Sequence, residues 1–488
     1  MKRYIGIPEK ISYENVEENY HKLSSNAYKR LLMKNTNYKT LGELLDRNLT
    51  RLDLGYEVGS SAYVKFSKYL FIKSRSLQEH SFLFNFGESA SEYIEPQAFV
   101  NMNLVENDII ISKDSNIGEV IMLDKDYPNT MLSGALYRLP ITQYKYYILA
   151  MIKHDIFRQQ LDFIVPKGAT IRHAKTLFLD CKIPFPNHNA EQSIKFIEIL
   201  TKSIIKKEAL IKTKHEAILR LIENELLTHQ LPYSFSYSYP TLEELKISGR
   251  LDTGIYSEEF KSIEFLIKNY KNGVFYLDKD NIRVGTTPTM RVFGDTLKYT
   301  WIAPKHCNEF GTIENEERIN FLGNPNLTQD CILLVCRGDK NKLASGIFYS
   351  IEQEGLGQYN QDFYKISNYP KSKLLFMLCF LNTKFMRKYC NFLSTGMTIK
   401  AFTISNFLQI PFPNFPQNIQ EKIAMLYHNP HLNLDYKGFN LENFTELDNE
   451  FCNKAGIYDL DKSIKHLKEI LNSSIDKIID DEKVHIAF

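Results

Sequence analysis

The chain has 488 residues, of which 43% are hydrophobic and 24% charged, and its net charge is +2. This length exceeds what one hydrophobic core usually supports, so we expect about two to four domains. The small net charge excludes a strongly basic protein, so any nucleic-acid-binding surface has to be local. The longest apolar run, residues 374–381, is far shorter than the roughly 20 residues that cross a bilayer. The N-terminus also lacks the apolar core of a secretion signal, and we expect a cytoplasmic protein.

The first part of the chain carries two short patterns that return later. Residues 12–33 predict one or two short helices. Thr-Leu-x-Glu-Leu then occurs at 40–44 and Arg-Leu-Asp at 51–53, and both patterns recur, in the same order, at 241–245 and 250–252. We interpret them as the front markers of a repeat that is about 200 to 230 residues long.

A β-hairpin is predicted inside each copy of the repeat. In the first copy, the apolar run 109–112 is followed by turn-forming residues 113–116 and a second apolar run at 118–123. The second copy has the corresponding pieces at 330–335, 337–341 and 345–349. Each hairpin leads to a further strand and then to a helix, predicted at 135–139 and 144–161 in one copy and at 361–366 and 371–393 in the other.

The end of each copy is marked by two further motifs. Gly-x-Thr-Ile occurs at 168–171 and at 396–399, and Ile-Pro-Phe-Pro follows at 183–186 and at 410–413. Proline on both sides of phenylalanine disfavours a helix and predicts an extended exit onto the next helix. The same motifs in the same order indicate an internal duplication.

A long helix follows the first Ile-Pro-Phe-Pro. Isoleucines at seven-residue intervals predict about 35 residues of helix, roughly 50 Å long, with a coiled-coil seam. Lys207 and Lys214 occupy the other seam positions and make the seam imperfect. We expect an antiparallel partner helix at the C-terminus, capped by Asp459 and preceded by an Asn-rich inserted loop at 432–455. The predicted seam residues are Ile197, Ile204, Ile211 and Ile218 in the first helix and Leu460, Ile464, Leu467, Leu471 and Ile478 in the second.

These elements predict a mixed α/β (α+β) fold. Two related domains are joined by a long antiparallel two-helix coiled-coil spacer with pseudo-two-fold symmetry. The predicted boundaries are an N-terminal helical segment (1–35), domain 1 (36–190), spacer 1 (191–229), domain 2 (230–416) and spacer 2 with its inserted loop (417–488).

This order of elements resembles the specificity subunit of type I restriction-modification systems, in which two target-recognition domains alternate with two helical conserved regions. The four markers carry the resemblance over nearly the whole chain. Gly-Thr-Thr-Pro at 285–288 and Tyr-Thr-Trp-Ile at 299–302 are similar to a Gly-Gly-Thr-Pro and Trp-Ile pattern common in those domains. The first copy lacks that pattern and has residues 59–64 in about that place. The insertion at 432–455 and the uneven helices also depart from simple members, which leaves the subunit contacts open.

The resemblance implies a DNA-recognition protein without catalytic activity. Each target-recognition domain would bind one half of an asymmetric bipartite site in double-stranded DNA, and the helices would dock methyltransferase subunits, expected to be two, and restriction or translocase subunits. No cofactor is expected in this chain, whereas S-adenosylmethionine, and ATP with Mg, are expected in partner subunits. The alternatives are a specificity subunit of a type IIB or methylation-only complex and, in another class, a protein scaffold that does not bind DNA, which the small net charge favours.

The candidate DNA contacts are basic and small polar residues in loops next to rigid strands. Candidates for base contacts are Lys113, Ser115, Asn116, Thr286, Thr287, Arg291, Arg337 and Lys340. Candidates for phosphate contacts, beside the repeated Thr-Ile step, are Arg172, Lys175 and Lys400. For each residue the alternative is an ordinary exposed turn or charged surface. The seam residues Ile197, Ile204, Ile211, Ile218, Leu460, Leu467 and Leu471 are candidates for the spacer and its subunit contacts.

Motifs for catalysis are missing from the sequence. It contains no Gly-x-x-x-x-Gly-Lys-[Ser/Thr] phosphate loop and no Asn/Asp-Pro-Pro-aromatic motif of amino-methyltransferases. The seven cysteines include no Cys-x-x-Cys pair, which favours reduced thiols over a zinc site. His428 and His431 lack further ligands, and residues 481–483 are typical of a charged helix end. We therefore predict recognition rather than catalysis.

Overall fold

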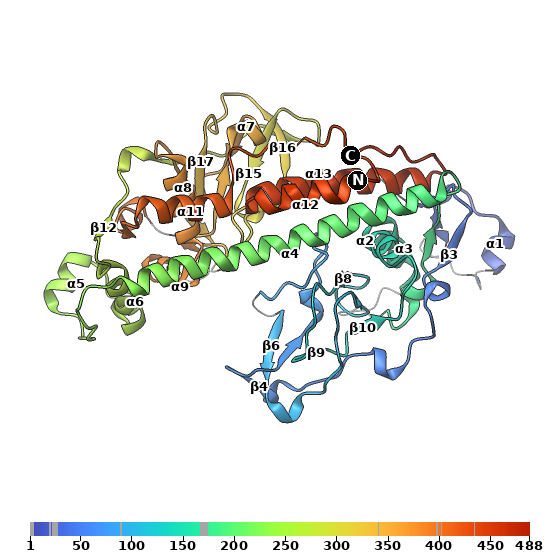
Figure 1. Cartoon of the computed structure of the whole chain (residues 1–488), viewed down its shortest axis with the longest axis horizontal. Coiled ribbons are helices and arrows are strands. Elements are labelled where there is room, and N and C mark those ends of the chain that lie inside the picture. Colours follow the sequence, from blue (N-terminus) through green and yellow to red (C-terminus); the bar gives the residue numbers. More distant parts are fainter. Residues whose placement is uncertain are drawn as a thin grey trace. The chain divides into compact units, whose positions relative to one another are not determined.

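The structure is a computed structural model that describes residues 4–18, 21, 28–87, 90–165, 174–339, 341–396, 399–401, 403–433 and 435–488. It is a mixed α/β chain (Figure 1) that divides into two compact units. Unit 1 comprises Met1–Leu210, Leu434–Asn453 and Lys462–Phe488, and unit 2 comprises Ile211–Asn433 and Lys454–Asp461. Each unit therefore combines one predicted target-recognition domain with part of the long helix and part of the C-terminal region.

Unit 1 is mainly a β structure followed by two short helices. Its elements up to the long helix are β1 (Ile5–Gly6), α1 (Tyr13–Glu18), β2 (Arg30–Leu31), β3 (Tyr38–Thr40), β4 (Tyr63–Val64), β5 (Leu70–Ile72), β6 (Ser91–Ile94), β7 (Ile109–Ser112), β8 (Val120–Met122), β9 (Thr130–Leu132), β10 (Leu136–Leu139), α2 (Lys145–Lys153), α3 (Asp155–Ile164) and β11 (Lys182–Pro184). Helix α4 (Ala190–Thr228), the long green helix of Figure 1, begins in unit 1 and ends in unit 2.

Two helices, α5 (Leu242–Ser248) and α6 (Glu258–Lys268), follow α4 in unit 2 and precede its strands. In chain order unit 2 then contains β12 (Val274–Phe275), β13 (Ile282–Val284), β14 (Arg291–Phe293), β15 (Tyr299–Ile302), β16 (Glu317–Phe321), β17 (Cys331–Val335), β18 (Arg337–Gly338), β19 (Gly346–Tyr349), α7 (Ile351–Glu354), β20 (Gly357–Tyr359), β21 (Phe363–Ile366), α8 (Lys371–Leu381), α9 (Lys384–Leu393), β22 (Lys400–Ala401), α10 (Ile404–Phe407), β23 (Phe412–Pro413) and α11 (Gln417–Tyr427).

The two units share their strand order. The first sheet runs β4-β6-β5-β9 in unit 1 and β14-β16-β15-β20 in unit 2, and in both the last pairing is parallel. The second sheet runs β10-β7-β8 in unit 1 and β21-β17-β19 in unit 2, where β13 adds a further strand beside β21. The strand of the Ile-Pro-Phe-Pro motif pairs antiparallel with an earlier strand in each unit, β11 with β3 and β23 with β12. The predicted duplication is therefore confirmed at the level of topology.

The predicted hairpins are present, but each predicted helix after them is two helices. Strands β7 and β17, whose side chains are all buried, pair antiparallel with β8 and β19. The predicted helix at 144–161 breaks at His154, whose ring accepts a hydrogen bond from the backbone N–H of Ile156. The predicted helix at 371–393 breaks where the Thr383 hydroxyl accepts one from the N–H of Met386. The apolar pattern continues through both breaks, so the caps and not the hydrophobic pattern end the helices.

One glycine in each unit joins the two sheets. The backbone N–H of Gly55 donates to Leu136 O of the second sheet, and the next N–H donates to Leu132 O of the first sheet. Gly285 and the residue after it make the same bonds, to Phe363 O and Tyr359 O. A Cβ on Gly55 would lie 2.1 Å from a backbone oxygen, and a Cβ on Gly285 would lie 1.9 Å from one. The counterpart of Gly285 is therefore Gly55, not residue 59 as the sequence suggested.

The two copies of the front marker Thr-Leu-x-Glu-Leu, at 40–44 and 241–245, are local capping motifs that stand at different points of their units. Thr40 ends β3 and exchanges hydrogen bonds with Glu43, whereas Thr241 caps α5 and exchanges them with Glu244. The strand equivalent to β3 in unit 2 is β12, which follows α5 and α6. The copy at 241–245 therefore precedes α5 and α6, whereas the copy at 40–44 begins at the last residue of β3. The two copies do not mark equivalent points of the repeat.

The C-terminal region contains three helices, because the predicted inserted loop is itself partly helical. These are α11, α12 (Phe444–Lys454), which lies within the predicted inserted loop, and α13 (Ile457–Ile479). In unit 1, α13 runs antiparallel to α4, because Asn187 bonds to Asp481 whereas Glu208 pairs with Lys468. Asp459 caps α13 from its third position, because its carboxylate accepts a hydrogen bond at 2.8 Å from the N–H of Gly456, the residue before the helix.

A buried ion pair compensates the imperfection of the seam in unit 1. Lys207, which occupies a predicted seam position, is completely buried and pairs with Asp448 of α12. Ser203 accepts a hydrogen bond from Lys207 Nζ at 2.6 Å and donates one to Asp448 Oδ2 at 2.8 Å. The segment that looked like a loop therefore supplies the counter-charge that a lysine in an apolar seam requires.

Replacing either joining glycine should destabilise its unit. We expect Gly55→Ala and Gly285→Ala each to lower the free energy of unfolding by about 1–3 kcal/mol or more, because the backbones must separate to admit the methyl group. Gly59→Ala is the matched control, since its Cβ would have 3.6 Å to the nearest atom at a φ of −67°. Urea unfolding with hydrogen exchange at β9 and β20 measures this, and equal stability of Gly55→Ala and Gly59→Ala would contradict the role of the joint.

Breaking the buried pair should cost more than replacing it. Asp448→Ala leaves the Lys207 ammonium buried without its counter-charge, so unit 1 should lose about 3–5 kcal/mol. The double variant Lys207→Met with Asp448→Leu removes both charges and should regain most of that loss. Denaturant unfolding of the full chain compares the two variants, and a double variant as unstable as the single one would show that the loss does not come from leaving the Lys207 ammonium unpaired.

Candidate nucleic-acid interface

The hairpin turn of unit 1 lies next to the segment that follows α3. The backbone N–H of Ala174 donates to Lys113 O at 2.9 Å, which places the predicted contacts Lys113 and Lys175 beside each other. The Lys113 ammonium is 2.6 Å from Asp114 Oδ2, so its charge is partly neutralised. Lys175 is exposed, with a left-handed backbone (φ +48°). Arg172 lies outside the described residues.

Unit 2 makes the same connection between hairpin turn and helix-end loop. Strand β18, with Arg337, pairs antiparallel with β22, with Lys400. Arg337 is exposed, and Lys400 Nζ donates to Asn391 O at 3.3 Å. Lys340 lies outside the described residues. In both units, therefore, a residue predicted to contact bases and one predicted to contact phosphate come from neighbouring backbone segments.

The remaining candidates of unit 2 lie along the joint and the first sheet. Exposed Thr286 accepts hydrogen bonds from the Gln358 side chain through its carbonyl and hydroxyl oxygens. The Thr287 hydroxyl donates to Gln361, next to the residue whose carbonyl accepts the N–H of Arg337. Arg291 lies apart on β14, where its guanidinium stacks over the Trp301 ring at 5.3 Å. Thr286, Thr287 and Arg337 thus approach one another, whereas Arg291 lies on the edge strand of the first sheet.

Ser115 and Asn116 line a cavity of about 360 Å³ in unit 1. Its charged lining consists of Arg158 and three carboxylates, those of Glu79, Glu119 and Asp162. The Asn116 side chain also donates to Leu77 O at 3.3 Å. A phosphate would meet an excess of negative charge here, so the electrostatics disfavour phosphate binding at this part of the turn.

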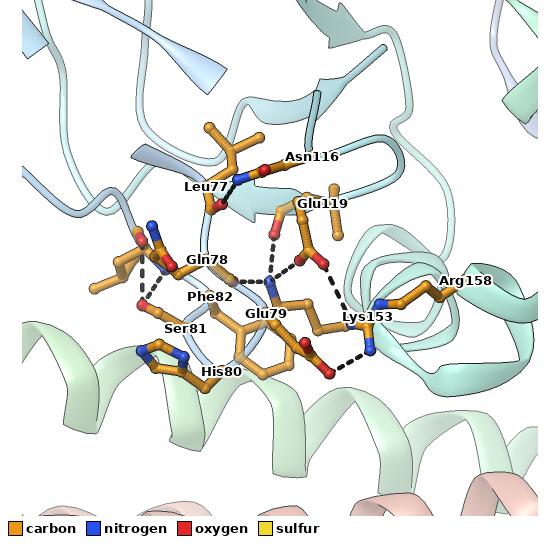
Figure 2. A network of polar contacts seen from close by, with 12 residues as sticks. Leu77, Gln78, Glu79, His80, Ser81, Phe82, Asn116, Glu119, Lys153 and Arg158 are labelled. Atoms are coloured by element: carbon orange, nitrogen blue, oxygen red, sulfur yellow. Dashed lines mark hydrogen bonds and ion pairs between the residues drawn. The ribbon is translucent and has the colours of Figure 1, made fainter. Parts of the chain in front are cut away.

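A polar network holds the base of the same hairpin on the helices (Figure 2). Lys153 of α2 donates to Gln78 O, to Val120 O at 3.1 Å and to the Glu119 carboxylate at 3.2 Å. Arg158 of α3 pairs with Glu79 and Glu119. These bonds attach the start of β8 and the loop before residue 80 to α2 and α3, which supports a turn held in one orientation.

The next turn of that loop is bound to the long helix. The Glu208 carboxylate of α4 accepts hydrogen bonds from Ser81 Oγ at 3.1 Å and from the N–H of Phe82 at 2.8 Å. It also pairs with Lys468 of α13 at 2.8 Å. Two neighbouring sets of charge-assisted bonds thus hold this loop, one to the hairpin, α2 and α3 and the other to α4 and α13.

A repeated pentapeptide in the first sheet was missed by the sequence analysis. Lys-Tyr-Leu-Phe-Ile at 68–72 occupies the place in unit 1 that Lys-Tyr-Thr-Trp-Ile at 298–302 occupies in unit 2. The signal was present, but the second motif had been aligned with residues 59–64. Both lysines are exposed.

The seam residues have a different environment from the loop candidates. Ile197, Ile204, Ile211, Ile218, Leu460, Leu467 and Leu471 are all buried within the chain. Their position suits the packing of the spacer itself. Exposed apolar side chains elsewhere are better placed for contacts with other subunits.

The described residues show neither a metal-binding cluster nor an exposed thiol. Among them, no cluster of three or more His, Cys, Asp or Glu side chains could hold a metal ion. Likewise, no helix in the described part of the chain is both long and apolar enough for a bilayer. All seven cysteines are buried, and burial raises the pKa of the Cys331 thiol to about 12, which keeps it protonated at neutral pH.

Comparisons with known proteins find similarity to solved structures. No protein-family model matches the chain, and no curated protein matches it. A type I restriction-modification S subunit from M. genitalium is 12% identical, with a TM-score of 0.38 over 91% of this chain and 95% of that one. The HsdS subunit from Thermoanaerobacter tengcongensis is 9% identical, with a TM-score of 0.26 over 91% and 96%.

A further similar chain comes from a structure that describes complex assembly and conformational transition of the type I R-M system. It is 10% identical, with a TM-score of 0.27 over 91% of this chain and 97% of that one. At these identities and TM-scores the similarities carry no functional argument.

The buried ammonium of the network should give unit 1 a distinctive pH dependence. Burial lowers the pKa of Lys153 from 10.5 to about 8. Between these pH values the unfolded chain binds more protons at this group than the folded chain, so this group's contribution favours folding increasingly as pH rises from 8 to 10.5. We expect the wild type to gain stability relative to Lys153→Gln across this window in urea unfolding. A pH-independent difference between the two proteins would contradict the assignment.

Proposed function

We propose that the chain is the cytoplasmic DNA-recognition (specificity) subunit of a type I restriction-modification complex. The observation that carries the proposal is the duplicated unit, in which one strand order supports different surface residues. Identical protein half-sites match palindromic DNA. Two related but different units therefore suit a bipartite target in double-stranded DNA whose halves differ.

Each unit contributes rigid strands that end in polar turns. The exposed Arg337 guanidinium has the geometry to donate two hydrogen bonds to a guanine, which is worth about 1–3 kcal/mol of discrimination. Lys175 and Lys400, each beside a hairpin turn, serve as phosphate contacts that position the protein without specifying sequence. Base contacts thus come from the turns, where the two units differ.

Partner subunits complete the activity in this proposal. Large apolar side chains are exposed on α5 and on the segments beside it, with Leu251 at 86% exposure, and an apolar surface of this kind supports a docking role. These side chains are Tyr239, Leu242, Ile247 and Leu251. Two methyltransferase subunits dock on the helical parts and bring S-adenosylmethionine, and restriction or translocase subunits bring ATP and Mg. This chain supplies recognition and holds no cofactor.

Exchanging one target-recognition domain should change only one half of the DNA motif. Methylome sequencing of cells with and without the intact locus should reveal an asymmetric bipartite methylated motif that depends on the gene. Replacing residues 36–190 with those of a homologue of different specificity should alter one half of the motif and leave the other unchanged.

Two results would contradict the proposal in different ways. If the exchange altered both halves, the assignment of one domain to each half-site would be wrong. If binding of the full chain to duplex DNA did not weaken between about 50 and 200 mM salt, phosphate contacts would be absent and the scaffold alternative would be favoured.

A further inference from the structure

The repeated pentapeptide occupies one register position in both units. Leu70 lies opposite Thr130 in the parallel pair of unit 1, and Thr300 lies opposite Gly357 in that of unit 2. On the other side, a glutamate faces the central aromatic residue in each copy: Phe71 is paired with Glu92, and Trp301 with Glu317. Lys68 and Lys298 are therefore equivalent residues at the entrance of β5 and β15.

The turn before each lysine has the same length in both units. Tyr63 faces Ile94 in unit 1 and Phe293 faces Ile319 in unit 2, which makes these aromatic residues equivalent as well. Five residues then separate each aromatic residue from the tyrosine that both copies share, Tyr69 in unit 1 and Tyr299 in unit 2. The turn that connects β4 to β5 thus matches the turn that connects β14 to β15.

The two lysines differ from their neighbours in how their charge is balanced. Lys73 and Lys305, which follow the same strands, are paired with Glu92 at 2.9 Å and with Glu317. Lys68 Nζ lies over the Tyr69 ring at 5.0 Å from its centroid, and Lys298 Nζ lies over the Tyr299 ring at 5.1 Å.

Within the described part of the chain, neither the Lys68 ammonium nor the Lys298 ammonium has a carboxylate at ion-pair distance. The lysine before the strand is thus an exposed, uncompensated cation in both units, whereas the glutamate neutralises the lysine after it.

The tips of the turns differ completely. Unit 1 has Lys65, Phe66 and Ser67, with Phe66 89% exposed, whereas unit 2 has Asp295, Thr296 and Leu297. An exposed phenylalanine suits contact with thymine methyl groups, and an aspartate accepts the amino group of cytosine. The constant part is suited to the constant backbone of DNA and the variable part to its bases.

We propose that these two turns are the matching DNA-contact elements of the units, with Lys68 and Lys298 as their phosphate contacts. This inference rests on the proposed function. A lysine ammonium binds phosphate as a point charge, and the tyrosine ring beneath each one holds it outward without neutralising it. The tips at 65–67 and 295–297 then face the base edges next to the bound phosphate.

The test measures how the affinity of the full chain for a mixed-sequence DNA duplex depends on salt. Lys68→Gln and Lys298→Gln should each weaken binding and reduce the slope of log affinity against log salt by about 1, and the double variant by about 2. Lys68→Arg and Lys298→Arg keep the charge and should keep the slope. The matched controls are Lys437→Gln in unit 1 and Lys422→Gln in unit 2, which also remove one exposed lysine each.

The outcomes separate this inference from the proposed function. If wild type shows a steep slope and the glutamine variants retain it, or if the control variants lower it equally, the two lysines are not specific phosphate contacts and the inference is wrong. If wild type itself binds duplex DNA without salt dependence, the proposed function fails first. Circular dichroism of each variant confirms that a lost slope does not come from unfolding.

Discussion

The contact on which each unit depends is the crossing of two backbones at a glycine. Gly55 and Gly285 donate to one sheet, and the residue after each donates to the other, so a single extended segment joins two sheets that have no strand in common. Backbone atoms can approach this closely where no Cβ intervenes. The orientation of the first sheet relative to the hairpin therefore follows from the glycine, and with it the direction in which both sets of turns point.

The strongest sequence patterns predicted the parts of the fold that local chemistry determines. The hairpins followed from buried β-branched runs with turn residues between them, and Ile-Pro-Phe-Pro correctly marked the strand that leads to a helix. The front markers misled, because a threonine with a glutamate three residues later caps any helical turn, wherever it stands in a repeat. The equivalence of Gly55 with Gly285 depends on a backbone approach between distant strands, and the sequence suggested residue 59 instead. Likewise the Lys-Tyr-x-aromatic-Ile repeat is too short to stand out until strand register aligns it.

The long helix shows how a defect in a pattern can be informative. Lys207 interrupts an apolar seam, and the sequence alone predicted that the seam is imperfect. Instead Asp448 and Ser203 surround its ammonium, and the segment that carries Asp448 is a helix and not an inserted loop. A buried charge pair of this kind adds little net stability, but it strongly penalises any register in which the partners separate. The polar seam position therefore fits a role in aligning α12 on α4.

The small net charge of the chain is compatible with DNA binding because compensation is local. In both units a glutamate neutralises the lysine after the central strand, whereas the lysine before it lies over a tyrosine ring. Carboxylates likewise outnumber the cation in the cavity beside the hairpin of unit 1. Most of these positive charges are thus paired with carboxylates, and those of Lys68 and Lys298 remain unpaired at the turns before β5 and β15. A phosphate contact depends on such local cations within about one Debye length and not on the sum over the chain. The β4–β5 and β14–β15 turns, and not the net charge, would therefore determine where DNA binds.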